Sequence, residues 1–304
     1  MVDITNKITT LRTATAQAII RAGSRKTIQS VLDKTVPKGD VLEVARTAGL
    51  FAVKNTASAI PDCHPMPIEF TGIVFECLDD FIKIEVTVKT IYKTGVEVEA
   101  MHGAAIVALT IYDMLKPIDK EVEISTIKLL HKNGGKSDFI THENALSAAV
   151  IVCSDSVSSG TKSDISGKTV IQKLEKFGLT VSKYEIIPDE VHAITEVVEN
   201  LCNQNINLIL LTGGTGLSRH DVTPEALIPM LDRRIPGIEE AIRSYGQNRT
   251  PYAMLSRSVA GFRGDTLILA LPGSAKGVAE SIDAVFPTVL HLFNILNGDS
   301  HGRS

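Results

Sequence analysis

The chain has 304 residues, 44% of them hydrophobic and 22% charged, with a formal net charge of -4. This length allows two domains of ordinary size, and the composition excludes extensive disorder. The slightly acidic balance argues against a nucleic-acid-binding protein. Because the first 140 residues hold 17 basic and 17 acidic side chains, a polyphosphate ligand there would need a local cluster of cations.

The four cysteines stand far apart, without the close pairs that hold zinc or iron–sulfur clusters, so we expect reduced thiols. No stretch reaches the ~18 uninterrupted apolar residues of a membrane span. Residues 1–10 are too polar for a secretory signal. We therefore expect a cytoplasmic protein that contacts no membrane.

Helices and a hairpin are predicted in the first 140 residues. Asp40 can cap a helix that runs to about Val53. Two β-rich stretches, 68–77 and 81–90, are close enough for a hairpin, and an apolar helix pattern covers 100–115. Hairpin strands with long helices predict an α+β domain over residues 1–140, and we expect it to be ferredoxin-like.

A glycine-rich and polar stretch, 133–144, separates two segments that differ in the spacing of their apolar residues. We place the linker at residues 141–146. Beyond it, short apolar runs alternate with amphipathic ones. This alternation predicts a three-layer α/β domain with a mostly parallel sheet over residues 147–304. The strands are expected at 148–152, 181–187, 206–211 and 267–271, and the helices at 165–177, 194–201 and 278–296.

Polar and glycine residues follow the ends of these strands, where parallel sheets bind ligands. The sequence Thr212–Gly216 is a glycine turn, whose backbone amides can approach a phosphate, and Asp221 just beyond it precedes a helix start. Such a carboxylate can hold a divalent metal that bridges nucleotide phosphates. Ser154–Ser156, Pro188–Glu190 and Pro272–Ser274 lie at other strand ends.

Together these motifs resemble the molybdopterin adenylyltransferase family, also called the MogA/MoaB family, over residues 147–298. The resemblance implies that Asp189 and Asp221 are catalytic, bind Mg²⁺ and serve transfer of AMP from ATP to molybdopterin. It implies that pterin and nucleotide are held by Asp155, Ser156, Gly213, Gly214, Thr215, Gly216, Pro272, Gly273 and Ser274. The alternative for Asp189 is turn formation or helix capping, and for Asp221 it is helix capping. Turn chemistry is the alternative for Asp155 and Ser156.

The helix pattern of the first domain places Asp113 and Lys116 on one face, where a solvated ion pair is the simple alternative. Around it stand Lys38-Gly39-Asp40, Cys63-His64-Pro65, Gly95-Val96-Glu97-Val98-Glu99 and His131-Lys132. With Met1-Val2-Asp3-Ile4, these segments resemble cyclic pyranopterin monophosphate synthase, the MoaC family, from residue 1 to about 140.

That resemblance implies conversion of a cyclised dihydro-GTP into cyclic pyranopterin monophosphate, with release of pyrophosphate. It implies catalytic roles for Asp113, Lys116 and Lys132, and a site completed across a subunit interface. The implied substrate-binding residues are Arg12, Lys38, Cys63, His64, Glu97, Val98 and Glu99. Proton transfers and a leaving pyrophosphate call for such acids, bases and cations.

The sequence as a whole predicts a bifunctional enzyme of molybdenum cofactor biosynthesis. Its ligands would be cyclised dihydro-GTP, molybdopterin and ATP with Mg²⁺, and no cofactor would be tightly bound. Threefold symmetry, with a hexamer favoured, is expected from the two families. Docking of molybdopterin synthase would fit, because the product of the first reaction lacks the sulfurs of molybdopterin. Two alternatives stay open: a second domain that binds molybdopterin without turnover, and a nucleotide-binding regulator built on both folds.

Overall fold

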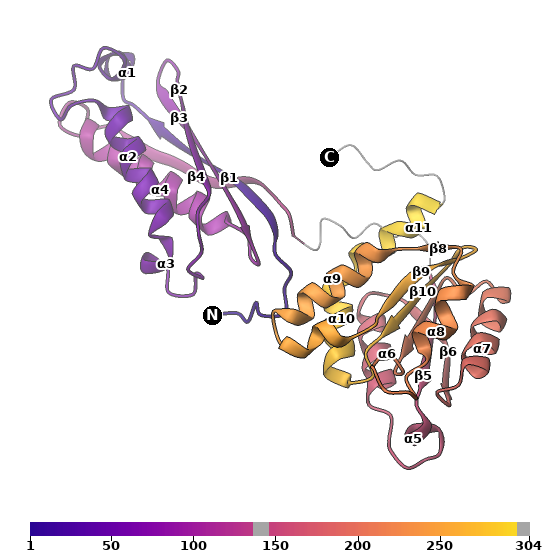
Figure 1. Ribbon diagram of the computed structural model, residues 1–304. Coiled ribbons are helices and arrows are strands. Elements are labelled where there is room, and N and C mark those ends of the chain that lie inside the picture. Colours follow the sequence, from indigo (N-terminus) through magenta and orange to yellow (C-terminus); the bar gives the residue numbers. More distant parts are fainter. Residues whose placement is uncertain (136–145, 297–304) are drawn as a thin grey trace. The chain divides into compact units, whose positions relative to one another are not determined.

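The computed structural model of the chain divides into two compact units, Met1–Asp138 and Phe139–Ser304 (Figure 1). Residues 1–135 and 146–296 are described by it. Of the linker placed at residues 141–146, all but Leu146 lies outside the described residues. Each unit has its own buried apolar core.

The first unit is built on a four-stranded antiparallel sheet. Its elements are β1 (Thr10–Arg21), α1 (Arg25–Leu32), α2 (Val41–Lys54), α3 (Thr56–Ala59), β2 (Phe70–Cys77), β3 (Phe81–Tyr92), α4 (Glu97–Leu115) and β4 (Glu123–Asn133). The strands lie in the order β2-β3-β1-β4. This order and the β-α-β-β-α-β succession are those of a ferredoxin-like domain, which confirms the predicted class.

Small residues let the helices come close to each other and to this sheet. Ala14, Ala16 and Ala18 of β1 are fully buried on one face of the sheet, and α4 packs against this strand. Where α2 meets α4, a β-carbon on Gly49 would lie 2.4 Å from a side-chain carbon of Val107. The close crossing therefore requires glycine at this position.

Helix α4 is long and apolar enough to cross a membrane by length and hydropathy. Half of its apolar window is buried inside the unit, and it packs against α2, β1, β3 and β4. The helix pair Ala275–Val285 and Thr288–Leu296 passes the same test only as a span bent by 59°. Burial of α4 on the sheet makes it the core helix of this domain.

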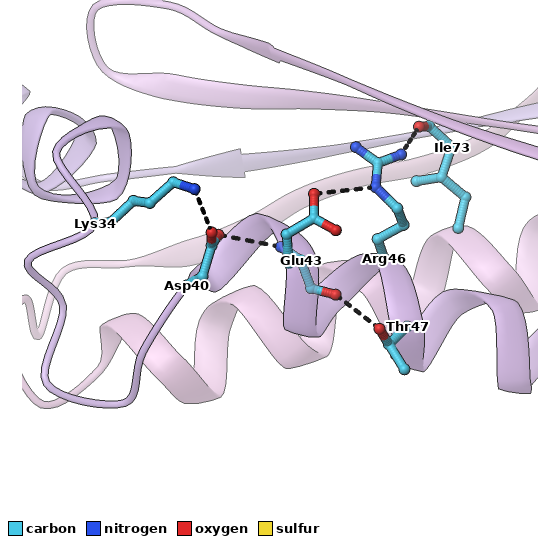
Figure 2. A network of polar contacts seen from close by, with 6 residues as sticks. All are labelled: Lys34, Asp40, Glu43, Arg46, Thr47 and Ile73. Atoms are coloured by element: carbon cyan, nitrogen blue, oxygen red, sulfur yellow. Dashed lines mark hydrogen bonds and ion pairs between the residues drawn. The ribbon is translucent and has the colours of Figure 1, made fainter.

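The start of α2 is fixed by a polar network (Figure 2). The Asp40 side chain accepts a hydrogen bond from the backbone amide of Glu43 at 3.3 Å, which confirms the predicted cap, and also pairs with Lys34 at 2.8 Å. One turn later Arg46 pairs with Glu43 and donates to the carbonyl of Ile73 on β2. This network anchors the loop that carries Lys38 to both helix and sheet.

The second unit is built on a six-stranded sheet. Its strands are β5 (Ser147–Cys153), β6 (Thr180–Ile187), β7 (Leu208–Thr212), β8 (Arg233–Arg234), β9 (Val259–Arg263) and β10 (Thr266–Leu271). They lie in the order β6-β5-β7-β10-β9-β8, in which the first four are parallel and β9 and β8 are antiparallel additions at one edge. The helices are α5 (Asp155–Ser158), α6 (Ser166–Lys176), α7 (Val191–Asn203), α8 (Thr223–Leu227), α9 (Pro236–Gln247), α10 (Ala275–Val285) and α11 (His291–Leu296).

Alternate residues of the central strands pack into two separate cores, one on each face of the sheet. Leu208 and Leu210 of β7 pack in the core formed with α6, α9 and α10, whereas Ile209 and Leu211 pack in the core formed with α7 and α8. Buried on both faces, the strands read as continuous apolar runs. The arrangement confirms the predicted three-layer α/β domain with a mostly parallel sheet.

Two features of this unit differ from the sequence prediction. The helix expected at residues 278–296 ends at Val285, because Pro287 cannot continue it, and a short 3-10 turn and α11 follow. The prediction also omitted α9 and the antiparallel strands β8 and β9. Strand β8 has only two residues, too few for a recognisable period.

Candidate active sites

Three loops meet at the carboxyl edge of the second unit's sheet, where β5, β7 and β10 end. The Thr212 hydroxyl donates to the carbonyl of Pro272 at 2.8 Å, and the amide of Gly213 donates to the carbonyl of Leu271 at 3.3 Å. A β-carbon on Gly273 would lie 3.2 Å from the Cα of Gly213. The structure therefore brings together the glycine turn and the proline-glycine element that the sequence singled out.

The first two glycines of the turn have no room for a side chain. Gly213 has a φ of +106° and Gly214 a φ of +60°, both in the left-handed region. A β-carbon on Gly213 would lie 2.1 Å from the Cys153 carbonyl oxygen. One on Gly214 would lie 2.3 Å from Thr223 Oγ1 and 2.5 Å from Asp189 Oδ1. The Asp189 carboxylate thus faces the turn directly.

Asp189 is the most perturbed carboxylate of this edge. Its Oδ1 is buried and has no hydrogen-bond partner among the described residues. Burial, followed by the negative charges of Asp155 and Asp221, raises the pKa of Asp189 to about 6. Helix α7 takes Glu190 as its N-cap and shows no side-chain capping bond. Asp189 is therefore not a helix cap, and its Oδ1 is available to a cation.

Asp221 is held at the base of the next loop. Its Oδ2 accepts a hydrogen bond from the Ser218 amide at 2.7 Å, and a β-carbon on Gly216 would lie 2.7 Å from the same oxygen. Helix α8 begins after Val222 with no side-chain cap, so Asp221 does not cap it. In the described part of the chain, protein groups alone form no cluster of three or more metal-ligating side chains.

The remaining residues predicted for this edge differ in their hydrogen-bond partners. Asp155 Oδ1 accepts the amide of Asp189 at 3.0 Å, so it positions that residue. Ser156 Oγ lies 3.3 Å from Ser154 Oγ. The Ser274 hydroxyl accepts the amide of Gly277 at 3.1 Å and caps α10, so its predicted ligand role would compete with that cap.

Sequence reasoning missed one residue at this edge, Arg257. Its backbone amide donates to the carbonyl of buried Thr215 at 3.0 Å, and its guanidinium donates to the carbonyl of Gly216 at 2.8 Å. Arg257 lies 36 residues beyond Asp221, and no local pattern in the sequence connects the two.

In the first unit, the predicted acid and base residues form a cluster at the end of α4. Lys38 Nζ lies 2.6 Å from Asp113 Oδ2, and Lys116 Nζ lies 2.8 Å from Asp113 Oδ1. The ammonium groups of Lys116 and Lys38 lower the pKa of Asp113 to about 2, and Asp113 raises the pKa of Lys116. In a single chain Lys116 is therefore a cation, and a neutral lysine would need burial that one protomer does not supply.

A second, cationic site lies at the start of α4, in a pocket of about 320 Å³. Of the predicted residues, Arg12, Glu97 and Lys132 line it, and Lys132 pairs with Glu97 at 2.9 Å. Lys7 and Lys93 also line it, although the sequence analysis did not single them out. Four cations around one pocket supply the local positive field that the balanced composition of this domain required.

Beside the first turn of α4, the thiol of Cys63 donates a hydrogen bond to Glu99 Oε1 at 2.9 Å. Burial and this carboxylate raise the pKa of Cys63 to about 12. Glu99 is 3% exposed, and its Oε2 has no partner among the described residues. His64 is half-buried and Val98 is exposed. The Cys63 thiol is a hydrogen-bond donor rather than a nucleophile.

The two clusters of the first unit lie at opposite ends of one helix. From Glu97 to Asp113 the rise of α4 corresponds to roughly 24 Å. One chain therefore does not bring Asp113, Lys116 and Lys38 to the cationic pocket. A single reaction centre that uses both clusters must draw them from two copies of the chain.

The fold and the two sites define a two-domain protein, with a ferredoxin-like domain that carries a cationic pocket and an α/β domain that carries carboxylates beside a glycine turn. Residues 1–135 match the MoaC family, and residues 149–291 match a family described as "Probable molybdopterin binding domain". The chain is 40% identical over 301 residues to the molybdenum cofactor biosynthesis bifunctional protein of Chlorobaculum tepidum, which covers 99% of this chain and 96% of that protein. It belongs to this family of bifunctional molybdenum cofactor biosynthesis proteins.

Other relatives match the whole chain or one half of it. The protein of the same description from Synechococcus elongatus is 36% identical over 316 residues, covering 99% of each chain. Cyclic pyranopterin monophosphate synthase of Clostridium perfringens is 48% identical over 139 residues, 45% of this chain and 87% of that protein. A solved structure of the molybdopterin biosynthesis enzyme MoaB from Thermus thermophilus is 39% identical, covers 52% of this chain and 99% of its own, and has a TM-score of 0.49.

Proposed function

We propose that the chain is a bifunctional enzyme. Its first domain converts cyclised dihydro-GTP into cyclic pyranopterin monophosphate and pyrophosphate, and its second transfers AMP from Mg-ATP to molybdopterin. For the second activity, the supporting observation is the buried, unpartnered oxygen of Asp189 that faces the glycine turn at Gly214. For the first, it is the cationic pocket at one end of α4 and the acid-base cluster at the other.

In the first domain, the cationic pocket suits a triphosphate. Arg12 is 7% exposed and its guanidinium donates to the carbonyls of Tyr92 and Lys93, so the charge is held at the pocket wall. Fixed cations lower the cost of the negative charge that develops on a leaving pyrophosphate. Asp113, ionised between Lys38 and Lys116, serves the proton transfers of the ring rearrangement.

Completion of the first site by a second copy is part of this proposal. The cluster around Asp113 from one protomer would meet the cationic pocket of its partner, because the rise of α4 keeps the two apart within a chain. A closed assembly repeats such a contact in every subunit. We propose a homohexamer with threefold symmetry, in which both domains can share one axis.

In the second domain, Asp189 and Asp221 fit a magnesium ion that accompanies ATP. Oxygen ligands are those that Mg²⁺ prefers, and Asp189 presents a buried oxygen with no partner among the described residues. The like charges of Asp155 and Asp221 add to the burial that raises the pKa of Asp189, and a cation between these groups would relieve that repulsion. The metal would neutralise phosphate charge during AMP transfer. The amides of the glycine turn, Gly213–Gly216, would hold phosphate oxygens.

A second domain that binds molybdopterin without turnover is the main alternative, and a regulator without either activity is another. Neither Asp189 nor Asp221 is used as a helix cap, which supports a role in binding a ligand or metal for both. A cap would explain a carboxylate without any ligand. A buried carboxylate oxygen that has no structural use is costly unless a ligand binds it.

The decisive experiment is incubation of the purified chain with each substrate, followed by mass analysis. Cyclised dihydro-GTP should yield cyclic pyranopterin monophosphate, and molybdopterin with Mg-ATP should yield the adenylylated pterin. Asp221→Asn should abolish the second reaction and leave the first at its original rate. Molybdopterin binding without any adenylylated product would establish the binding module, and loss of both reactions in this variant would contradict independent sites.

The two reactions are not consecutive. The product of the first lacks the dithiolene sulfurs of molybdopterin, so a sulfur-transferring synthase must act between them. We propose that the fusion serves joint assembly or docking of that synthase in the cytoplasm.

A further inference from the structure

The side chain of Arg257 ties together the two ends of the loop that carries Asp221. Its Nε donates to the carbonyl of Gly216 at 2.8 Å, and its Nη2 donates to the carbonyl of Asp221 at 2.7 Å. Between these two carbonyls the chain makes an exposed excursion over residues 217–220. Both acceptors are backbone atoms, so the contact fixes the path of the main chain.

Two further contacts hold Arg257 in this place. Its Nη1 pairs with Glu225 in the first turn of α8, and this bond lowers the pKa of the Glu225 carboxyl. The Arg257 backbone amide donates to the carbonyl of Thr215 at 3.0 Å. Arg257 stands just before β9, so the antiparallel edge of the sheet anchors it. We call Arg257, with its bonds to the carbonyls of Gly216 and Asp221, the clamp. A planar guanidinium meets several acceptors in fixed directions, which a lysine cannot do.

The clamp acts on the position of the Asp221 carboxylate. Inside the excursion, Asp221 Oδ2 accepts the Ser218 amide at 2.7 Å, and the Asp221 amide donates to the Ser218 carbonyl at 3.0 Å. These two bonds orient the carboxylate relative to its own loop, whereas Arg257 fixes that loop relative to the glycine turn. Without the clamp, the two bonds between Ser218 and Asp221 would open more often, and their loop would no longer be held in register with Gly216.

We propose that Arg257 is a positioning residue for the nucleotide metal. It holds Asp221 at the distance from Asp189 at which both carboxylates can serve one magnesium ion of Mg-ATP. This inference rests on the proposed adenylyl transfer, and it adds a residue outside the glycine turn and the strand ends on which that proposal depends. Residues that orient a metal ligand typically change metal affinity by about 10- to 100-fold when removed.

The test compares Arg257→Ala and Arg257→Lys with a matched control, Arg263→Ala. Arg263 forms an ion pair of 3.0 Å with Glu199 at the far end of β9, so it controls for loss of a nearby arginine and its ion pair. Hydrogen exchange at the Ser218 and Asp221 amides reports the loop, and calorimetry with Mg-ATP reports binding, both without turnover. Adenylyl transfer as a function of Mg²⁺ separates the metal requirement from kcat at saturating metal.

Arg257→Ala should speed exchange of both amides and weaken Mg-ATP binding by about 10- to 100-fold, with the loss of transfer largely restored at high Mg²⁺. Arg257→Lys should fall between this variant and the unmodified chain, and Arg263→Ala should change none of these. Unchanged exchange in Arg257→Ala together with weaker binding would make Arg257 a direct phosphate ligand and overturn the inference. Faster exchange with unchanged binding would overturn it too.

The same measurements separate this inference from the proposed function. If the unmodified chain binds Mg-ATP but makes no adenylylated product, the transfer reaction is wrong and the binding data still decide the role of Arg257. If it binds no Mg-ATP at all, both are wrong. If the unmodified chain and Arg257→Ala transfer AMP equally at every Mg²⁺ concentration, only the role of Arg257 is wrong.

Discussion

The Asp189 Oδ1 atom lies 2.5 Å from the point where a β-carbon on Gly214 would stand. The glycine is therefore required by its own φ of +60° and also by the carboxylate in front of it. A single methyl group at this place would displace the group that we propose binds the metal. The main chain of the turn and the proposed metal ligand are fitted to each other here.

Gly214→Ala should abolish adenylyl transfer, because the methyl group would press on Thr223 Oγ1 and Asp189 Oδ1. Gly178→Ala is the matched control: its φ of +76° carries a similar backbone cost of about 1 kcal/mol, and its β-carbon would meet nothing within 4 Å. Product formation and thermal unfolding of both variants test this. Equal loss of activity in the two would assign the effect to backbone strain alone.

Asp189→Asn should stabilise the ligand-free second domain at neutral pH while it abolishes transfer. The folded pKa of Asp189, about 6, lies above the ordinary value of 3.8, so the stability that the protonated acid contributes is lost as pH rises through 6. For a half-exposed group the gain at pH 7 should be roughly 1 kcal/mol. Calorimetry should show this gain in stability at pH 7 and not at pH 4. The exposed variant Asp265→Asn should show no gain at either pH.

Two inactive variants of the first domain should restore each other if the site is shared between copies. Asp113→Asn and Lys132→Ala should each lower turnover by at least ~100-fold. Co-expressed, they should recover about a quarter of the original activity, because half of the pairs would be mixed and hold one intact site of two. Asp113→Asn with Lys116→Ala removes two groups of one cluster and should recover nothing. Absence of recovery in the first pair would place the whole site within one chain.

Asp164→Asn should destabilise the second domain by about 1–2 kcal/mol. Asp164 is buried and accepts bonds from Tyr184 Oη at 2.7 Å and from the amides of Gly167 and Lys168 at the start of α6. Burial raises its pKa, but these bonds outweigh it and the pKa is lowered. The stabilisation is therefore present above pH 3.8 and lost as pH falls below it. Denaturant unfolding at pH 7 and pH 3 should show the difference narrowing in acid, with Tyr184→Phe intermediate.

A chain cut after Asp138 should retain both activities, since each unit has its own core. With the missing synthase added, the mixed halves should make adenylylated product after the same delay as the intact chain. A lag confined to the cut chain would show that an intermediate passes between the domains.

Local patterns in the sequence predicted many of the elements, although not the strands β1 and β4. The hairpin and α4 were found because one face of each is buried and the other is exposed, and the parallel strands because both of their faces are buried. The Asp40 cap was found because an aspartate directly precedes the apolar helix pattern. The end of α10 at Val285 was missed, since apolar spacing continued past Pro287. Strand β8 and the antiparallel edge depend on pairing between distant residues, which no local pattern records.

The candidate sites divide in the same way. Residues on glycine turns and at strand ends, such as Gly213 and Asp189, follow from local motifs and a resemblance to known families. Arg257 and Lys93 were missed because their significance arises only when distant segments fold together. The distance between Asp113 and Lys132 came only from the structure, although the resemblance already implied a site shared between subunits.

The length of α4 sets a limit on how this domain can vary. One inserted residue would turn Asp113 by about 100° relative to Glu97 and move it about 1.5 Å along the axis. The exposed side chains between them could then vary, whereas their number could not. If the two clusters serve one site as proposed, α4 fixes the distance between them, and insertions and deletions in related chains should be confined to the loops around it.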